Sequence, residues 1–386
     1  MAAEEETRSL ALADYRDRVA GAWIGENIAV VMSLPFEGRP KAPEPLTGYM
    51  RWKNTKNFAA GLEPAHPTAA PCDDDTYYEF VALRAFERFG LDMTPRQLGE
   101  QWIADGAGFY ASSQAARKAM LAGHWPPESG HPKHNPHYNT IGAQFSSELF
   151  GMIAPGSINF SAATARLYNH INGYAEGSDG GVAFATMISE AMLEPDMRRV
   201  VRRALLVLDP RAPTRVACEE GLAFREQGLD WPEAAARSQR RWKPLYPQIN
   251  NSVANAALVA LGLVYGDGDF LKTISITCQA ADHADTDCNA GTAGAIVGAH
   301  CPLSGIPERL ITPLNDTYQV RHNRNVTDIV LPPRDEKLSD IARRIAALGE
   351  RFIVAKGGAH IEGDRLVIPN PAPIAQPLET WPPAGK

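Results

Sequence analysis

Three adjacent carboxylates, Asp73, Asp74 and Asp75, stand immediately before a segment with the apolar spacing of a helix. Helix capping explains one or two acids there: an Asp or Thr as N-cap, a capping box of Thr76 with Glu79, and a favourable macrodipole. Three in a row repel one another unless they are screened or bound to a cation. The motif therefore leaves two interpretations open, a helix cap and part of a metal site.

A second acidic string, Asp285 and Asp287 within the sequence DHADTDCN, precedes a helix built from very small residues over 290–298. A helix with such small side chains can lie in the middle of a bundle with its N-terminus facing a cavity. Carboxylates from two converging helix starts would offer the hard oxygen ligands that Mg²⁺, Mn²⁺ or Ca²⁺ require. Capping also explains this second string when it is considered alone.

The elements that must position these acids are predominantly helical. Apolar residues recur at helical spacing over most of the chain, and strand signals are scarce. Helices are expected near residues 10–32, 76–89, 113–121, 142–152, 181–194, 197–208, 214–227, 232–241, 250–264, 269–283, 288–299 and 336–350. We therefore predict one compact all-α domain over residues 10–350, interrupted by a long proline-rich loop at 33–72.

The chain after residue 350 differs in character. Residues 351–354 and 365–368, separated by a glycine-rich turn, are predicted to form a small β-hairpin. The segment that follows has too much proline for a helix, so 351–386 is expected to be a hairpin and an extended tail packed on the domain.

The composition of the chain limits the kinds of partner and the cellular location that we expect. The 386 residues carry 38 Lys and Arg against 45 Asp and Glu, a net charge of −7, which disfavours nucleic acid as the main partner. No uninterrupted run of about 18 apolar residues occurs, so no membrane span is expected, and the N-terminus lacks the features of a signal peptide. Five cysteines without a CxxC pair disfavour a disulfide scaffold or a zinc module, and together these features predict a cytoplasmic protein. The oligomeric state stays open.

Four stretches of the chain, in order, resemble the ADP-ribosylglycohydrolase family. They are Gly21–Glu26 with Pro35–Gly38, Asp73–Thr76, Ile141–Gln144 with Pro155 and Gly156, and Asp285–Asn289 with Gly294–Ala299. Together they span roughly residues 15–320. The resemblance implies a compact all-α domain with two Mg²⁺ ions at the base of a cleft, and a hydrolase that cleaves the bond to C1 of an ADP-ribosyl ribose.

The resemblance also implies roles for individual residues. Six residues are predicted to lie in the metal site: Asp73, Asp74, Asp75, Asp285, Asp287 and Cys288. Asp73 stands where the family usually has a hydroxyl ligand, and Cys288 replaces a threonine. Because a thiol is a soft donor, either Cys288 does not bind the metal or the site is altered, with one or two Mg²⁺ ions and Mn²⁺ as the alternative. Asp74 or Glu37 would take the proton of the attacking water.

A further set of residues is predicted to contact the substrate or support the metal site: Thr76, Gly142, Gln144, His170, Ser178, Asp179, Gly180 and His283. The stretch over 177–181 can bind a phosphate through backbone N–H groups at a helix start, or can simply be a glycine-rich helix start that packs closely.

Three functions remain open at this stage. The first is a metal-dependent glycohydrolase acting on an ADP-ribosyl or similar ribofuranosyl linkage. The second is a hydrolase of a small nucleoside or furanoside, which the shortage of a basic diphosphate-binding patch in the matched motifs favours. The third is a catalytically silent ligand-binding relative, which the four matched aspartates disfavour and Cys288 favours.

Overall fold

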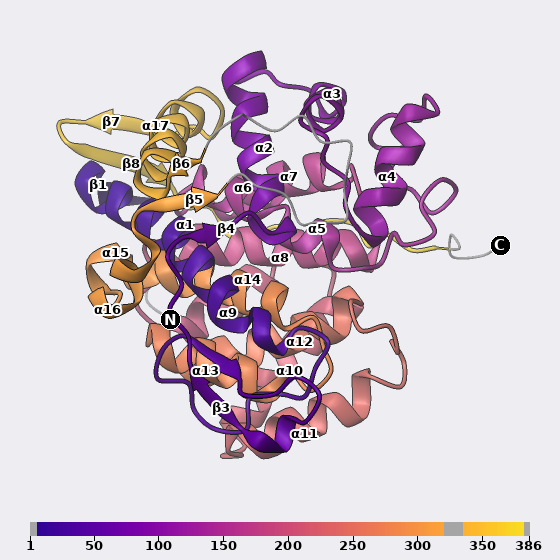
Figure 1. The fold of residues 1–386 in the computed structure, drawn as a ribbon. Coiled ribbons are helices and arrows are strands. Elements are labelled where there is room, and N and C mark those ends of the chain that lie inside the picture. The colour runs from indigo at the N-terminus through magenta and orange to yellow at the C-terminus, as the bar shows by residue number, and fades with distance from the viewer. Residues whose placement is uncertain (1–5, 320–334, 382–386) are drawn as a thin grey trace.

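The computed structural model describes residues 6–319 and 335–381, and its architecture is mostly helical, as predicted (Figure 1). The α-helices are α1 (Leu12–Ser33), α2 (Asp74–Phe89), α3 (Pro95–Asp105), α4 (Ala111–Leu121), α5 (Gly142–Phe145), α6 (Glu148–Met152), α7 (Ile158–Asn169), α8 (Glu176–Ala191), α9 (Met197–Leu205), α10 (Pro213–Glu226), α11 (Trp231–Trp242), α12 (Ser252–Gly266), α13 (Phe270–Ala280), α14 (Thr286–His300), α15 (Pro302–Gly305), α16 (Glu308–Ile311) and α17 (Leu338–Lys356). Three short 3₁₀ turns add to these: η1 (Leu34–Phe36), η2 (Phe58–Ala60) and η3 (Thr312–Leu314).

The strands are short and form three small sheets. They are β1 (Thr7–Ala11), β2 (Met50–Trp52), β3 (Leu62–Pro64), β4 (Ala70–Pro71), β5 (Thr317–Gln319), β6 (Glu336–Lys337), β7 (His360–Glu362) and β8 (Arg365–Pro369). The sheet β1-β8-β7 is antiparallel, β2 pairs antiparallel with β3, and β5 pairs parallel with β4 and antiparallel with β6. The sheet that contains β4 lies next to α2, whose first residues follow β4 closely along the chain.

The pair α1 and α14 forms the centre of the molecule (Figure 1). The two backbones touch where small residues face each other: an added Cβ at Gly298 would lie 2.1 Å from the carbonyl oxygen of Gly21, and one at Gly294 would lie 2.8 Å from that of Gly25. Almost every residue of α14 is buried. The small residues of α14 are thus explained by close helix packing, and this packing fixes the position of its N-terminal acids.

The C-terminal hairpin exists, but the prediction of its first strand was wrong. Residues 351–354 belong to α17, because buried apolar residues continue at helical spacing through Phe352 and Ile353 and the helix ends only at Gly357. The hairpin instead pairs β7 with β8 around Gly363, and β1 from the N-terminal end adds a third strand. The helices α3, α7, α15 and α16 and the strands β1 to β6 were not predicted.

The tail after β8 runs over α7 and the start of α8. Arg166 bonds to Gln376 and Glu379, the side chain of Asn159 bonds to the backbone of residues 372 and 374, and His170 lies 3.0 Å from Glu379. The last five residues of the predicted tail lie outside the described residues. The division of the chain at residue 350 stays a prediction.

Within the described ranges, one helical stretch, Leu12–Phe36, is long and apolar enough to cross a membrane, with a mean hydropathy of 1.4. The stretch is not an uninterrupted apolar run, because charged residues such as Asp17 and Glu26 break it. Buried residues make up 78% of the most apolar window, and buried core helices pass the same test of length and composition.

Candidate metal centre and its cavity

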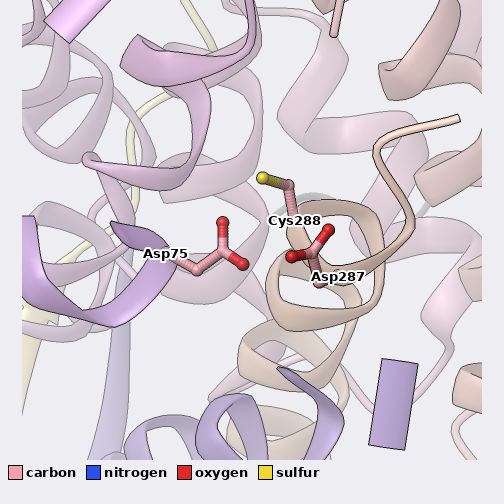
Figure 2. Close-up of side chains that lie close together, drawn as sticks. All are labelled: Asp75, Asp287 and Cys288. Carbon is pink, nitrogen blue, oxygen red and sulfur yellow. The ribbon is translucent and has the colours of Figure 1, made fainter. Parts of the chain in front are cut away.

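The two acidic helix starts meet in the structure although more than two hundred residues separate them. Asp75 from the first turn of α2 lies beside Asp287 and Cys288 from the first turn of α14, and one ligand atom from each lies within 4.8 Å of the others. Figure 2 shows the carboxylates of Asp75 and Asp287 facing each other, with the sulfur of Cys288 close to both. All three side chains are buried.

The start of α2 is set by Asp73. Its carboxylate accepts a hydrogen bond from the backbone N–H of Asp74 at 2.9 Å, so Asp73 is the N-cap. The predicted capping box does not form: the Thr76 hydroxyl lies 3.0 Å from the hydroxyl of Tyr318, and Glu79 is buried in the core. Asp73 thus has a structural task, and it does not line the cavity described below.

A short loop holds Glu37 next to the start of α14. The backbone N–H of Gly38 donates to the carbonyl of Ala284 at 3.0 Å, and the Thr286 hydroxyl donates to the carbonyl of Phe36 at 3.2 Å. His283, which has a φ of 49°, adds a backbone bond to the carbonyl of Arg39 at 2.9 Å. These bonds tie residues 36–39 to the turn before α14 and bring Glu37 to the acidic cluster.

A cavity of about 230 Å³ opens above the acids. Its floor and one wall carry Glu37, Asp74, Asp285, Asp287 and Cys288. The remaining lining residues come from the start of α4, from the segment around α5 and from the loop before α12; they are Tyr110, Ala111, Ser112, Ser113, Thr140, Ile141, Gly142, Phe145, Ile249 and Asn250. The cavity thus combines four carboxylates with hydroxyl and amide groups that suit a polyhydroxylated ligand.

Burial and mutual repulsion raise the pKa values of the acids in this site. Burial, together with the charges of Asp285 and Asp73, raises the pKa of Glu37 to about 7. Burial, followed by the charges of neighbouring aspartates, raises the pKa of Asp75 and of Asp287 well above the ordinary range. A bound cation stabilises carboxylates that crowd in this way, because its charge offsets their mutual repulsion and favours their charged form.

The unpartnered oxygens support the same conclusion. Among the described residues, no N–H or hydroxyl group donates to either carboxylate oxygen of Asp75 or to Oδ1 of Asp287, although all three atoms are buried, and the Cys288 thiol lies beside Asp75. Buried polar atoms in proteins are rarely left without a partner, and a hard divalent cation accepts carboxylate oxygens as ligands. Asp75 and Asp287, with Asp74 and Asp285 beside them, are therefore a donor set that fits Mg²⁺ or Mn²⁺.

Cys288 adds a sulfur atom, which is a soft donor, to this group of hard carboxylate oxygens. Burial, with the charges of Asp285 and Asp75, raises the pKa of its thiol well above the usual value. This shift favours the protonated thiol, and a protonated thiol is a poor metal ligand.

A pH dependence of stability follows for the protein without metal. Because the pKa values of Glu37 and the aspartates are higher in the folded than in the unfolded state, their contribution is complete below about pH 4 and is lost as the pH rises through the folded-state values. In EDTA, we expect the free energy of unfolding from urea titrations to fall between pH 5 and pH 8 by roughly 2 kcal/mol or more. Added Mg²⁺ should reduce this fall. A stability in EDTA that rises over this range would contradict the burial of the acids.

Some of the other residues that were predicted to contact the substrate line the cavity, and others do not. Gly142 lines the cavity, where an added Cβ would lie 2.3 Å from the Ser112 hydroxyl. Gln144 is fully buried and does not line the cavity. Thr76 also lies outside the lining, and His283 is exposed on the far side of its turn, with its ring 3.3 Å from the carbonyl of Gly38.

The stretch over 177–181 packs inside the fold instead of facing the cavity. A Cβ added at Gly177 would lie 2.0 Å from the carbonyl oxygen of Tyr138, and the neighbouring Gly180 is also tightly enclosed. The Ser178 hydroxyl donates to the Asn169 side chain, and Asp179 forms an ion pair with Arg166 at 2.6 Å. Of the two sequence interpretations, the geometry favours the glycine-rich, closely packed helix start. His170 belongs to the same region and lies against the tail, beside Glu379.

Sequence reasoning missed the cavity wall opposite the acids, including Ser112, Ser113, Thr140 and Asn250. Hydroxyl and amide residues are common in loops and at helix starts, so no local pattern marks them. The backbone gives one sign, which appears only in the structure: Ala111 has a φ of 38°, an unusual conformation for a residue with a side chain.

Comparisons with known proteins identify a family and a similar fold. The family model described as ADP-ribosylglycohydrolase matches residues 11–350. A solved structure named "ADP-ribosylglycohydrolase-related protein complex" is similar, with a TM-score of 0.53 and 17% sequence identity, and the match covers 88% of this chain and 99% of that chain. At this identity the likeness shows the fold alone. No curated protein matches the chain.

Proposed function

Because the chain belongs to the ADP-ribosylglycohydrolase family, we propose that it is a metal-dependent glycohydrolase that hydrolyses the C1 bond of an ADP-ribosyl or related ribofuranosyl substrate. One observation carries the proposal. Acids from α2, from α14 and from the loop at Glu37 converge on one cavity, and beside it both carboxylate oxygens of Asp75 and Oδ1 of Asp287 are buried without a hydrogen-bond partner among the described residues. A cytoplasmic location is part of the proposal and is consistent with five free cysteines.

In this proposal Asp75 and Asp287 hold the metal, and Asp74 and Asp285 complete its surroundings from the cavity floor. When bound, the divalent cation neutralises the carboxylates and polarises the oxygen atoms that it contacts. Asp73 keeps its capping bond to the backbone of Asp74, and so fixes the direction in which α2 presents its acids.

Glu37 is the proposed general base. Hydrolysis at C1 of a furanose passes through an oxocarbenium-like state, and the attacking water must lose a proton. Glu37 lines the cavity and is held in place by the bonds of the loop at 36–39, and its burial raises its pKa above the ordinary value, which favours proton uptake near neutral pH. Asp74 lines the same cavity and is the alternative base.

A second candidate substrate class follows from the charge of the cavity wall. Among residues 6–319 and 335–381, those that line it include four acids and no Lys, Arg or His. The described part of the wall therefore offers no cationic side chain to a diphosphate group. This observation favours hydrolysis of a nucleoside or another small furanoside as the second candidate function.

The test is a hydrolysis assay with ADP-ribosyl-arginine and ADP-ribosyl-serine peptides, free nucleosides and aryl ribofuranosides, each with Mg²⁺, with Mn²⁺ and with EDTA. We expect metal-dependent release of ADP-ribose or ribose from at least one class. The Glu37→Gln variant should lose about 10²- to 10⁴-fold in kcat. Full activity in EDTA would contradict the metal dependence, and no hydrolysis of any substrate would leave the silent relative as the correct interpretation.

Replacement of the soft donor gives a separate prediction. Cys288→Ser puts a hydroxyl oxygen beside Asp75 and Asp287, and oxygen is the donor that Mg²⁺ prefers. We expect the variant to bind Mg²⁺ about tenfold more tightly relative to Mn²⁺ than the parent does, as measured by competition calorimetry. Cys278→Ser, at a buried cysteine that does not line the cavity, is the control. An unchanged preference in Cys288→Ser would show that this side chain does not contact the metal.

A further inference from the structure

A second group of acids lies in the core, apart from the cavity. Glu26 on α1, Glu79 on α2 and Glu148 on α6 each place one carboxylate oxygen within 4.8 Å of the other two. No more than 1% of any of these residues is exposed, and none of them lines the cavity above Asp287. We refer to these three residues as the glutamate cluster.

Most other buried acids in the fold differ from the glutamate cluster because each of them pairs with an arginine. Four buried acids outside both groups each have an arginine partner within 3.3 Å: Asp105 with Arg84, Asp179 with Arg166, Glu190 with Arg8 and Arg203, and Glu194 with Arg199. In residues 6–319 and 335–381, the glutamate cluster has no Lys, Arg or His partner. Among the buried acids of the same described ranges, only Asp75 and Asp287, the proposed metal ligands, also lack such a partner.

The oxygens of the glutamate cluster also lack hydrogen-bond donors. Oε1 of Glu148 accepts a bond from the Thr292 hydroxyl at 2.6 Å. Both oxygens of Glu26, both oxygens of Glu79 and Oε2 of Glu148 have no partner among the described residues, although they are fully buried. Five unpartnered oxygens from three helices therefore point to a ligand that accepts oxygen donors and carries positive charge.

We propose that the glutamate cluster binds one hard divalent cation, Mg²⁺ or Mn²⁺, at a site separate from the cavity. Such ions take carboxylate oxygens at about 2.1 Å, so neighbouring ligand oxygens lie about 3 to 4 Å apart, a spacing that the cluster reaches with small side-chain movements. The ion supplies the charge that arginine supplies at the four other buried acids. It would link α1, α2 and α6, and so hold the helix that carries Asp75 against α1.

The test compares how much Mn²⁺ each protein retains. The parent and the variants Asp287→Asn, Glu26→Gln and Glu190→Gln are loaded with Mn²⁺, treated briefly with EDTA and desalted, and the metal per chain is measured by mass spectrometry. The cavity site is open to the chelator, whereas the cluster is enclosed. We therefore expect the parent and Asp287→Asn to retain one Mn²⁺ each and Glu26→Gln to retain none. Glu190→Gln, a buried glutamate with arginine partners, is the matched control and should retain the ion.

Two results would overturn the proposal: an Asp287→Asn protein that retains no Mn²⁺, or a folded Glu26→Gln protein that retains as much as the parent. Either result would mean that the three carboxyl groups are protonated and bond to one another. If Glu26→Gln does not fold, Glu148→Gln takes its place: loss of the retained Mn²⁺ supports the proposal, and retention at the level of the parent overturns it. The measurement on Asp287→Asn does not depend on either variant. The hydrolysis assay tests the proposed function separately from this proposal. A parent protein without hydrolase activity would still retain the Mn²⁺ of the glutamate cluster.

Discussion

The Asp287→Asn variant is expected to bind Mg²⁺ or Mn²⁺ in the cavity at least about 100-fold more weakly than the parent and to lose its hydrolase activity accordingly. Asp287 faces Asp75 and belongs to both the three-residue group and the cavity lining. The substitution keeps the shape of the side chain and removes one charge from the donor set. Calorimetric titration of metal into both proteins measures the change, and the hydrolysis assay follows its consequence.

Asp282→Asn is the matched control for this experiment. Asp282 lies on the turn that precedes α14, only five residues before Asp287, but it accepts a bond from the backbone of Lys41 and does not line the cavity. Its substitution should leave metal binding within about twofold of the parent, as expected for a partly exposed charge outside the site. If Asp287→Asn binds metal as tightly as this control, the assignment of the ligands is wrong.

The largest effect on stability is expected for Gly298→Val. A Cβ at this position would lie 2.1 Å from the carbonyl oxygen of Gly21 and 2.6 Å from its carbonyl carbon, and both atoms are backbone. The two central helices would have to separate, which should cost about 3 kcal/mol or more in the free energy of unfolding. Urea unfolding followed by circular dichroism measures this loss.

Gly48→Val provides the comparison. No heavy atom lies within 4 Å of a Cβ added at Gly48, so this substitution should change the free energy of unfolding by less than about 0.5 kcal/mol. Equal stabilities of the two variants would show that α1 and α14 do not approach as closely as described. The position of Asp287 at the start of α14 would then be in doubt as well.

The sequence was informative where one local pattern had one physical cause. The small residues over 290–298 predicted a helix inside a bundle, and the structure places α14 there, against α1. The two acidic strings lie at helix starts as predicted, because aspartates suit the first turn of a helix. Capping and metal binding do not exclude each other at α2, where Asp73 caps the helix and Asp75 faces Asp287.

Other features could not be predicted because they depend on contacts between distant segments. Glu79 was assigned to a capping box, since nothing in the local sequence shows that Glu26 and Glu148 lie beside it. The stretch over 177–181 has the composition of an anion-binding loop, and only the tertiary packing of Gly177 shows that it is closed. The hairpin was misplaced because residues 351–354 suit a strand locally, while the helical spacing of α17 extends through them.

The most direct test of the central claim is anomalous diffraction at the manganese edge from crystals grown with Mn²⁺. The account predicts a peak within ligand distance, about 2.2 Å, of carboxylate oxygens from both Asp75 and Asp287. Crystals at the same Mn²⁺ concentration with no peak between these two side chains would contradict it.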